Sequence, residues 1–167
     1  MTKILLSLHV LAAILAVGPV TVAASMFPAA ARKVTVALPV GAPAVAGAQA
    51  GTGDAGVSTV RVLHRICRVY AGLGIAVPVL GFATAAAMGV LGDAWLIASI
   101  TLTAVAAGLL AAFVLPRQEE LLEQLTGRQP VERAATARLA MFTGLFNLLW
   151  ATVTILMIVR PGSTTGA

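Results

Sequence analysis

The sequence is poor in the residues that build most soluble proteins. Charged residues make up only 10% of its 167 residues, whereas 59% are hydrophobic and the mean hydropathy is +0.99. A soluble domain carries about 25% charged residues, so this composition excludes an ordinary soluble globule and a disordered chain. Cys67 is the only cysteine, which excludes an intramolecular disulfide and an all-cysteine metal cluster. The composition therefore indicates a small integral membrane protein.

Signatures of catalysis are missing as well. The sequence contains no P-loop, no Rossmann fingerprint, no HExxH zinc motif and no nucleophile elbow. No carboxylate lies within an apolar segment, and a proton-coupled exporter needs such a group to couple protons to substrate. Two histidines, His9 and His64, offer little for a histidine-based metal site. We therefore predict no catalytic residue and no metal site, and we expect a protein that is not an enzyme.

Four apolar segments are each long enough to cross a bilayer as a helix, which takes about 20 residues. They are residues 4–27, 70–90, 94–115 and 139–159. None contains Asp, Glu, Lys or Arg. We expect Pro28 and Pro116 to end the first and third segments, and Pro78 to kink the second. The prediction is a single-domain, all-α, four-helix transmembrane bundle.

Basic residues are distributed unevenly among the loops. The loops after the first and third segments hold nine of them: Arg32, Lys33, Arg61, Arg65, Arg68, Arg117, Arg128, Arg133 and Arg138. The two ends of the chain hold only Lys3 and Arg160. By the positive-inside rule, both basic loops are cytoplasmic and both termini lie outside a bacterial plasma membrane. The net charge of +5 is then a topology signal, and no nucleic-acid binding is expected.

A cleaved signal peptide is the alternative interpretation of the first segment. Lys3 precedes the segment, and the small residues at 22–24 resemble a cleavage site. However, the apolar run of about 24 residues is longer than a usual signal-peptide core. Cleavage would also place the basic 28–69 segment outside, against the charge rule. We therefore favour a retained span.

Two different segments connect the first span to the second. Residues 34–59 are rich in Ala, Gly, Pro and Val without a helical period, and they predict a flexible cytoplasmic linker. Residues 60–70 read VRVLHRICRVY, and on a helix Arg61, Arg65 and Arg68 share one face with the neighbouring histidine beside them. Apolar residues cover the opposite side. This pattern predicts an interfacial amphipathic helix whose arginines face the lipid headgroups.

Small residues form a stripe along the second span, at Gly74, Pro78, Gly81 and Ala85. Such a stripe lets a neighbouring backbone approach closely, so we expect these residues to pack against another helix. The turn at residues 89–93 is very short, which predicts that the second and third spans form an antiparallel hairpin.

Few polar side chains lie within the apolar segments. His9 is the only ionisable one well inside a segment, and alanines at helical spacing turn it toward the bundle. It is either a neutral imidazole bonded between helices or a ligand for haem or a metal. His64 differs from it in depth by most of the bilayer, so the two cannot ligate one iron within a chain. Ser99, Thr103 and Asn147 either hydrogen-bond between helices or form an intramembrane polar pocket with the first histidine.

Two motifs carry a resemblance to a known family. They are LHVLAA at 8–13 with Gly18-Pro19, and LHRICRVY at 63–70. With the four-span layout they resemble an uncharacterised family of bacterial, often actinobacterial, integral membrane proteins without an assigned activity. More remotely, the early histidine is similar to that of the copper-resistance-D and membrane protoporphyrinogen-oxidase types. There such a histidine serves a haem or copper site, and His9 is the one residue that matches.

Three functions remain open from the sequence. The first is a non-enzymatic accessory or interaction subunit, working with other membrane subunits or as a homo-oligomer in the lipid bilayer. The second is a haem- or metal-binding redox protein that uses His9. The third is a small transporter or channel that uses the stripe of Asn147, Ser99 and Thr103.

Overall fold

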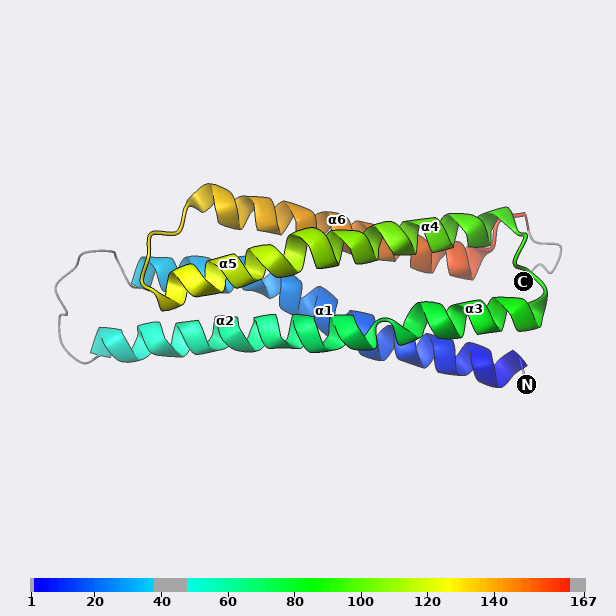
Figure 1. Cartoon of the computed structure of the whole chain (residues 1–167), viewed down its shortest axis with the longest axis horizontal. Helices are drawn as coiled ribbons and strands as arrows, with labels where there is room; N and C mark the ends of the chain where they lie inside the picture. The colour runs from blue at the N-terminus through cyan, green and yellow to red at the C-terminus, as the bar shows by residue number, and fades with distance from the viewer. Residues whose placement is uncertain (1, 38–47, 163–167) are drawn as a thin grey trace.

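The computed structural model describes residues 2–37 and 48–162, and within them every element is a helix (Figure 1). The elements are α1 (Thr2–Ala37), α2 (Ala48–Leu73), α3 (Ala76–Met88), α4 (Ala94–Leu109), the π-helix η1 (Leu110–Val114), α5 (Leu115–Thr126) and α6 (Arg133–Val159). α3 continues the line of α2, while η1 and α5 continue that of α4, so four long rods make up the bundle. Each rod is long and apolar enough to span a membrane, which confirms the predicted all-α, four-helix membrane fold.

One pole of the bundle holds the start of α1, the α3–α4 turn and the end of α6 (Figure 1). We call it the terminal pole. α1 packs along α2, α3 and α6, while α4 packs along α6 and α5 packs along α2. The predicted short turn joins α3 to α4, and near it Ala85 packs with Trp95 and Leu96. Beyond this turn the two helices have different main partners, since α3 lies on α1 and α4 lies on α6.

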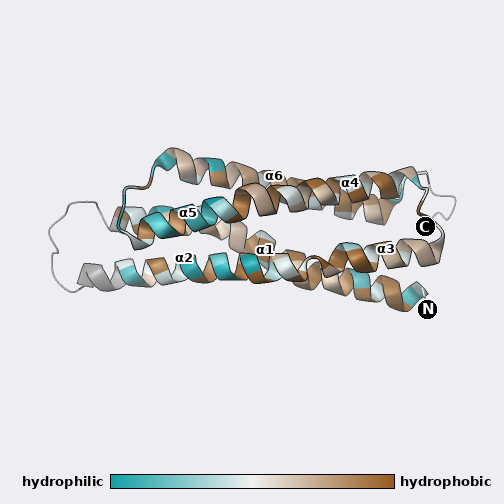
Figure 2. Ribbon diagram, viewed as in Figure 1, coloured by the Kyte–Doolittle hydropathy of each residue, from teal (hydrophilic) through white to brown (hydrophobic). Residues whose placement is uncertain are grey.

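Hydropathy (Figure 2) and charge divide the bundle into two halves. The apolar half is residues 2–24, 69–114 and 143–159, and the basic half is residues 25–37, 48–68 and 115–142. The apolar half contains only Lys3 and Asp93 as charged residues, both near the terminal pole. The basic half contains nine basic and five acidic residues. The two halves are therefore built for different surroundings.

Three arginines on three rods mark the border between these halves. Arg68, Arg117 and Arg138 lie about 20–23 residues from the helix ends at the terminal pole, which is about 30–35 Å of helix. The hydrocarbon core of a bilayer is about 30 Å thick. The apolar half thus matches one bilayer in length, and the basic half extends beyond it.

Neither proline that was expected to end a span ends its helix. α1 continues through the buried Pro28 to Ala37, because the residues around this proline pack in the main core against α2. The third rod continues through Pro116, which follows η1 at the start of α5. At this point the N–H of Leu115 donates to the carbonyl of Leu110, five residues earlier. This wider turn accommodates a proline ring that an ideal α-helix would not.

The predicted linker at 34–59 is largely helical where the structure describes it. α1 reaches Ala37 and α2 begins at Ala48, while residues 38–47 of the predicted linker lie outside the described residues. Gly56 allows α1 to approach α2 closely, since a Cβ atom there would lie 2.7 Å from Val34 Cγ2. Val57, the next residue, and Val60, one turn after Gly56, are also buried. Packing against α1 therefore stabilises a helix at residues 48–59, a segment that shows little period and holds as many glycines as alanines.

The expected kink in the second span is a break between α2 and α3. It lies at Gly74 and Ile75, one turn before Pro78. Pro78 has no N–H to give to the carbonyl of Gly74, and the N–H of Val77 donates to it instead at 3.1 Å. The proline therefore accounts for a break in the second span, as predicted, and the irregular turn lies on its N-terminal side.

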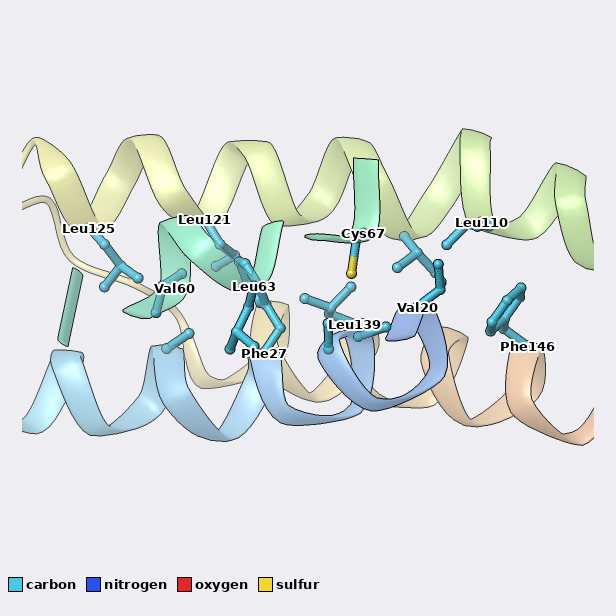
Figure 3. Close-up of a cluster of buried hydrophobic side chains, with 14 of the residues drawn as sticks. Val20, Phe27, Val60, Leu63, Cys67, Leu110, Leu121, Leu125, Leu139 and Phe146 are labelled. Atoms are coloured by element: carbon cyan, nitrogen blue, oxygen red, sulfur yellow. The ribbon is translucent and has the colours of Figure 1, made fainter. Parts of the chain in front are cut away.

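The main hydrophobic core lies mostly in the basic half (Figure 3). There Phe27, Leu63, Leu121, Leu125 and Leu139 meet from four helices, and none is more than 8% exposed. In the apolar half the buried positions are mostly Ala, Val, Ser and Thr. Large aliphatic side chains there point outward. The basic half is thus packed like a water-soluble bundle, and the apolar half like a membrane protein.

Candidate functional site: the buried polar side chains

His9 joins α1 to α3 in the apolar half. Its Nδ1 donates to the carbonyl oxygen of Val77 at 3.0 Å, and its ring lies over Gly81. A Cβ atom at Gly81 would lie 2.8 Å from His9 Cε1, so only glycine leaves room for the imidazole. The carbonyl bond requires the tautomer with hydrogen on Nδ1. His9 thus forms the hydrogen bond between helices that was one of its two expected roles. The bond uses Nδ1 and leaves Nε2 without a part in it.

The other three polar candidates bond to separate partners. Ser99 donates to the carbonyl of Trp95 at 2.8 Å, and Thr103 donates to the carbonyl of Ser99 at 2.7 Å, both within α4. Asn147 Nδ2 instead donates from α6 to Ser25 Oγ on α1 at 2.9 Å. In the part of the chain that the structure describes, no side chain-to-side chain hydrogen bond joins any two members of the proposed polar pocket, and the Thr103 bond to the Ser99 carbonyl is a backbone contact within one helix.

The Asn147 contact lies beside two unpaired oxygen atoms. Asn147 Oδ1 and Thr143 Oγ1 are both buried and have no hydrogen-bond partner among the described residues. They are one helical turn apart on α6, and Thr143 is only 2% exposed. The Asn147 bond to Ser25 ties α1 to α6, which is the role of interhelical adhesion that sequence reasoning assigned to such residues.

The small-residue stripe of the second span is only partly turned inward. Gly81 packs on His9, and Ala85 is 4% exposed beside Trp95. Pro78 is exposed, and Gly74 lies at the helix break. The inward face of α3 also includes residues that the stripe did not contain, namely Val77 and Thr84. The position of α1 decides which face of α3 is buried, whereas the sequence shows only which small residues share a face.

The three arginines of α2 are exposed, as predicted, but the histidine is not beside them. Arg61, Arg65 and Arg68 lie on the surface, whereas His64 is 7% exposed and points into the bundle. α2 is amphipathic, yet it runs in line with α3 and packs lengthwise on α1 and α5 (Figure 1). The helix therefore belongs to the bundle itself, and its buried side includes a polar group.

That polar group belongs to a buried cluster that sequence reasoning missed. His64 Nδ1 donates to Gln118 Oε1 at 3.2 Å, and Gln118 Nε2 lies 3.6 Å from Cys67 Sγ. Gln118 and Cys67 are fully buried, so the cluster ties α2 to α5 inside the main core. Gln118 begins the acidic segment QEELLEQL at 118–125, in which an exposed position is the usual one for a polar residue. The signal for its burial is its spacing of three residues from Leu121 and seven from Leu125.

Metal and small-ligand sites have little support in the geometry. Among the described residues, no group of three or more His, Cys, Asp and Glu side chains is placed to hold a metal ion. A surface hollow of about 30 Å³ lies between α5 and α6, with Arg117, Glu120 and Gln124 in its lining. Pockets for small molecules are about 300–1,000 Å³, so this hollow holds no more than a water molecule.

Most charged side chains of the basic half form no ion pair among the residues that the structure describes. Arg117 Nε lies 3.8 Å from Glu120 Oε2, and this exposed pair is the one ion pair found among residues 2–37 and 48–162. Such pairs contribute about 0–1 kcal/mol. The remaining cations of this half are therefore available to an external anionic group.

No protein-family model, curated protein or solved structure matches this chain.

Proposed function

We propose that this chain is a non-enzymatic membrane subunit that uses its basic half to dock an acidic partner protein. One observation carries the proposal: a well-packed core supports a surface with nine basic and five acidic residues, of which only Arg117 and Glu120 form an ion pair among the residues that the structure describes. A rigid surface loses little entropy on binding, and its charge attracts an acidic partner. By the charge rule, this half faces the cytoplasm of a bacterial cell, and both termini lie outside the plasma membrane.

Cross-linking in native membranes tests the docking role. A photoreactive residue at Ser58, which is exposed on α2, should cross-link to a discrete protein with an acidic surface. Neutralising Arg32, Lys33 and Arg133 to glutamine should lower the yield at least fivefold, because these residues lie on the basic half away from the border. Lys3→Gln is the matched control at the terminal pole and should leave the yield unchanged. Absence of a discrete cross-linked protein, or equal yields from all variants, would overturn the proposal.

Cysteine labelling tests the orientation. With Cys67 changed to serine, Gly92→Cys in the α3–α4 turn at the terminal pole should react with a membrane-impermeant maleimide in intact cells. Ser58→Cys should react only after the membrane is permeabilised. Both positions are exposed on the bundle, so accessibility differs by side rather than by burial. The reverse labelling pattern would place the basic half outside.

Haem or metal binding by His9 is a second candidate, and one observation favours it. Ligating histidines usually donate their other ring N–H to a carbonyl or carboxylate, as His9 Nδ1 does to Val77. Nε2 would supply the ligand atom. The test is the visible spectrum of the purified protein, oxidised and then reduced. A Soret band that shifts on reduction and is lost in His9→Ala supports this function, and a featureless spectrum from haem-supplied cells removes haem.

A further inference from the structure

Two exposed arginines of α2 lie at the border of the apolar half. Arg68 is about 20 residues, or about 30 Å of helix, from the terminal pole, and Arg65 is one turn beyond it. Both side chains are exposed and lie on the edge of α2 that carries Arg61. Among the described residues, neither has a carboxylate within ion-pairing distance. Two guanidinium groups thus face the depth at which lipid phosphates lie.

Next to these arginines, toward the apolar half, the surface becomes smooth and apolar. Gly72 continues the same helical edge, and a Cβ atom built there would have no neighbour within 4 Å. Val69, Leu73 and Ile75 around it are 52%, 56% and 67% exposed. A cationic pair above an open apolar strip is complementary to a molecule with an anionic head and a hydrocarbon tail. A free anion would contact the two arginines alone and would leave the apolar strip uncovered.

We infer that Arg65 and Arg68 bind the phosphate of an anionic phospholipid, and that one acyl chain lies along the strip at Gly72 and Leu73. Guanidinium groups form paired, charge-assisted hydrogen bonds with phosphate oxygens. A zwitterionic lipid carries its own ammonium group, which competes for that phosphate, so an anionic headgroup binds better. This lipid site does not depend on the proposed partner protein, because Arg65 and Arg68 lie at the border of the halves and the docking test changes residues farther from it.

Arg61 supplies a matched control on the same helix. It is exposed on the same edge as Arg65 and Arg68, and its change to glutamine removes the same charge. However, it lies seven residues from Arg68, which is about 10 Å farther from the apolar half. A general attraction to anionic surfaces would involve all three residues equally. A built lipid site depends on Arg65 and Arg68 alone.

Native mass spectrometry of the detergent-purified full-length protein tests this inference. With added phosphatidylglycerol, wild-type protein should retain one lipid at least tenfold more strongly than with phosphatidylcholine. The double variant Arg65→Gln/Arg68→Gln should lose that preference, while Arg61→Gln should stay within twofold of wild type. Inorganic phosphate at millimolar concentration should not displace the lipid, because it lacks the acyl chain.

The inference would be overturned by equal retention of the two lipids, by unchanged retention in the double variant, or by an equal loss in Arg61→Gln. Displacement by inorganic phosphate would likewise reject a lipid as the ligand and favour a soluble phosphate. Circular dichroism and gel filtration of each variant show that the fold is intact, and the double lysine variant Arg65→Lys/Arg68→Lys should bind with intermediate strength.

Discussion

The two halves of this bundle differ in which side chains they bury, large ones in the basic half and small ones in the apolar half. In the basic half, large side chains such as Phe27 and Leu121 are buried and the charges lie outside. In the apolar half, Leu15 and Leu148 are 66% and 67% exposed, while Ala106 and Ser99 are fully buried. Water drives large apolar groups inward in the first case. Lipid gives no such drive in the second, so close backbone approach and van der Waals packing decide which residues lie inside.

Truncation of large side chains tests this comparison with the largest expected effect. Phe27→Ala should lower the free energy of unfolding by about 3–5 kcal/mol, because it opens a cavity in the main core. Leu148→Ala removes a lipid-facing side chain and should cost less than about 0.5 kcal/mol. Reversible denaturation in mixed micelles measures both. Equal losses would mean that the two halves do not differ in the way described.

Adding one methyl group at each close approach probes both halves. Gly56→Ala meets Val34 in the basic half, and Gly81→Ala meets His9 in the apolar half, so each should cost about 1–3 kcal/mol. Gly108→Ala is the matched control, since nothing lies within 4 Å of a Cβ atom there. Unfolding in mixed micelles again gives the values. A neutral Gly81→Ala would show that the histidine ring does not rest on α3.

Removing a polar side chain compares hydrogen bonding in the two halves. Gln118→Leu leaves His64 without its buried partner and should cost about 1–3 kcal/mol. Asn147→Leu removes one interhelical bond to Ser25 and should cost about 0.6 kcal/mol. The double variant Gln118→Leu/His64→Leu should recover part of the first loss, because no buried group is then left unpaired. If Asn147→Leu costs more than Gln118→Leu, the polar contact that joins Asn147 to Ser25 at the border of the halves is the stronger one.

The smallest effect is expected for the exposed ion pair. Glu120→Gln breaks the 3.8 Å contact with Arg117 and should change stability by less than about 0.5 kcal/mol. Repeating the measurement at high salt should leave the difference between variant and wild type near zero. A loss above about 1 kcal/mol would indicate that this surface is more desolvated than the geometry implies.

Several features were predictable because they depend on composition or on local chemistry. Each of the four apolar segments lies within a helix of spanning length, except for residues 89–90 at the end of the second. Arg61, Arg65 and Arg68 are exposed because charges on an amphipathic helix avoid a core. Pro78 breaks the second rod because it removes one backbone donor. None of these outcomes requires knowledge of which helix is the neighbour.

Other features depended on neighbours and were predicted wrongly or missed. Pro28 and Pro116 lie within continuous rods, because core packing at the first and a π-turn before the second accommodate them. The segment around Gly56 is helical because Val34 packs against it. Gln118 looked like a residue of an exposed acidic helix, and its burial depends on the position of α2.

The sequence by itself determined the number of rods, their helical state and the division into an apolar and a basic half. The physical reason is that hydrocarbon tolerates neither charges nor unpaired backbone groups, so length and composition suffice. Only the tertiary structure decided which residues meet: His9 with Val77, and His64 with Gln118. Helical spacing places a side chain on a face, but the partner on the other side comes from a distant part of the chain.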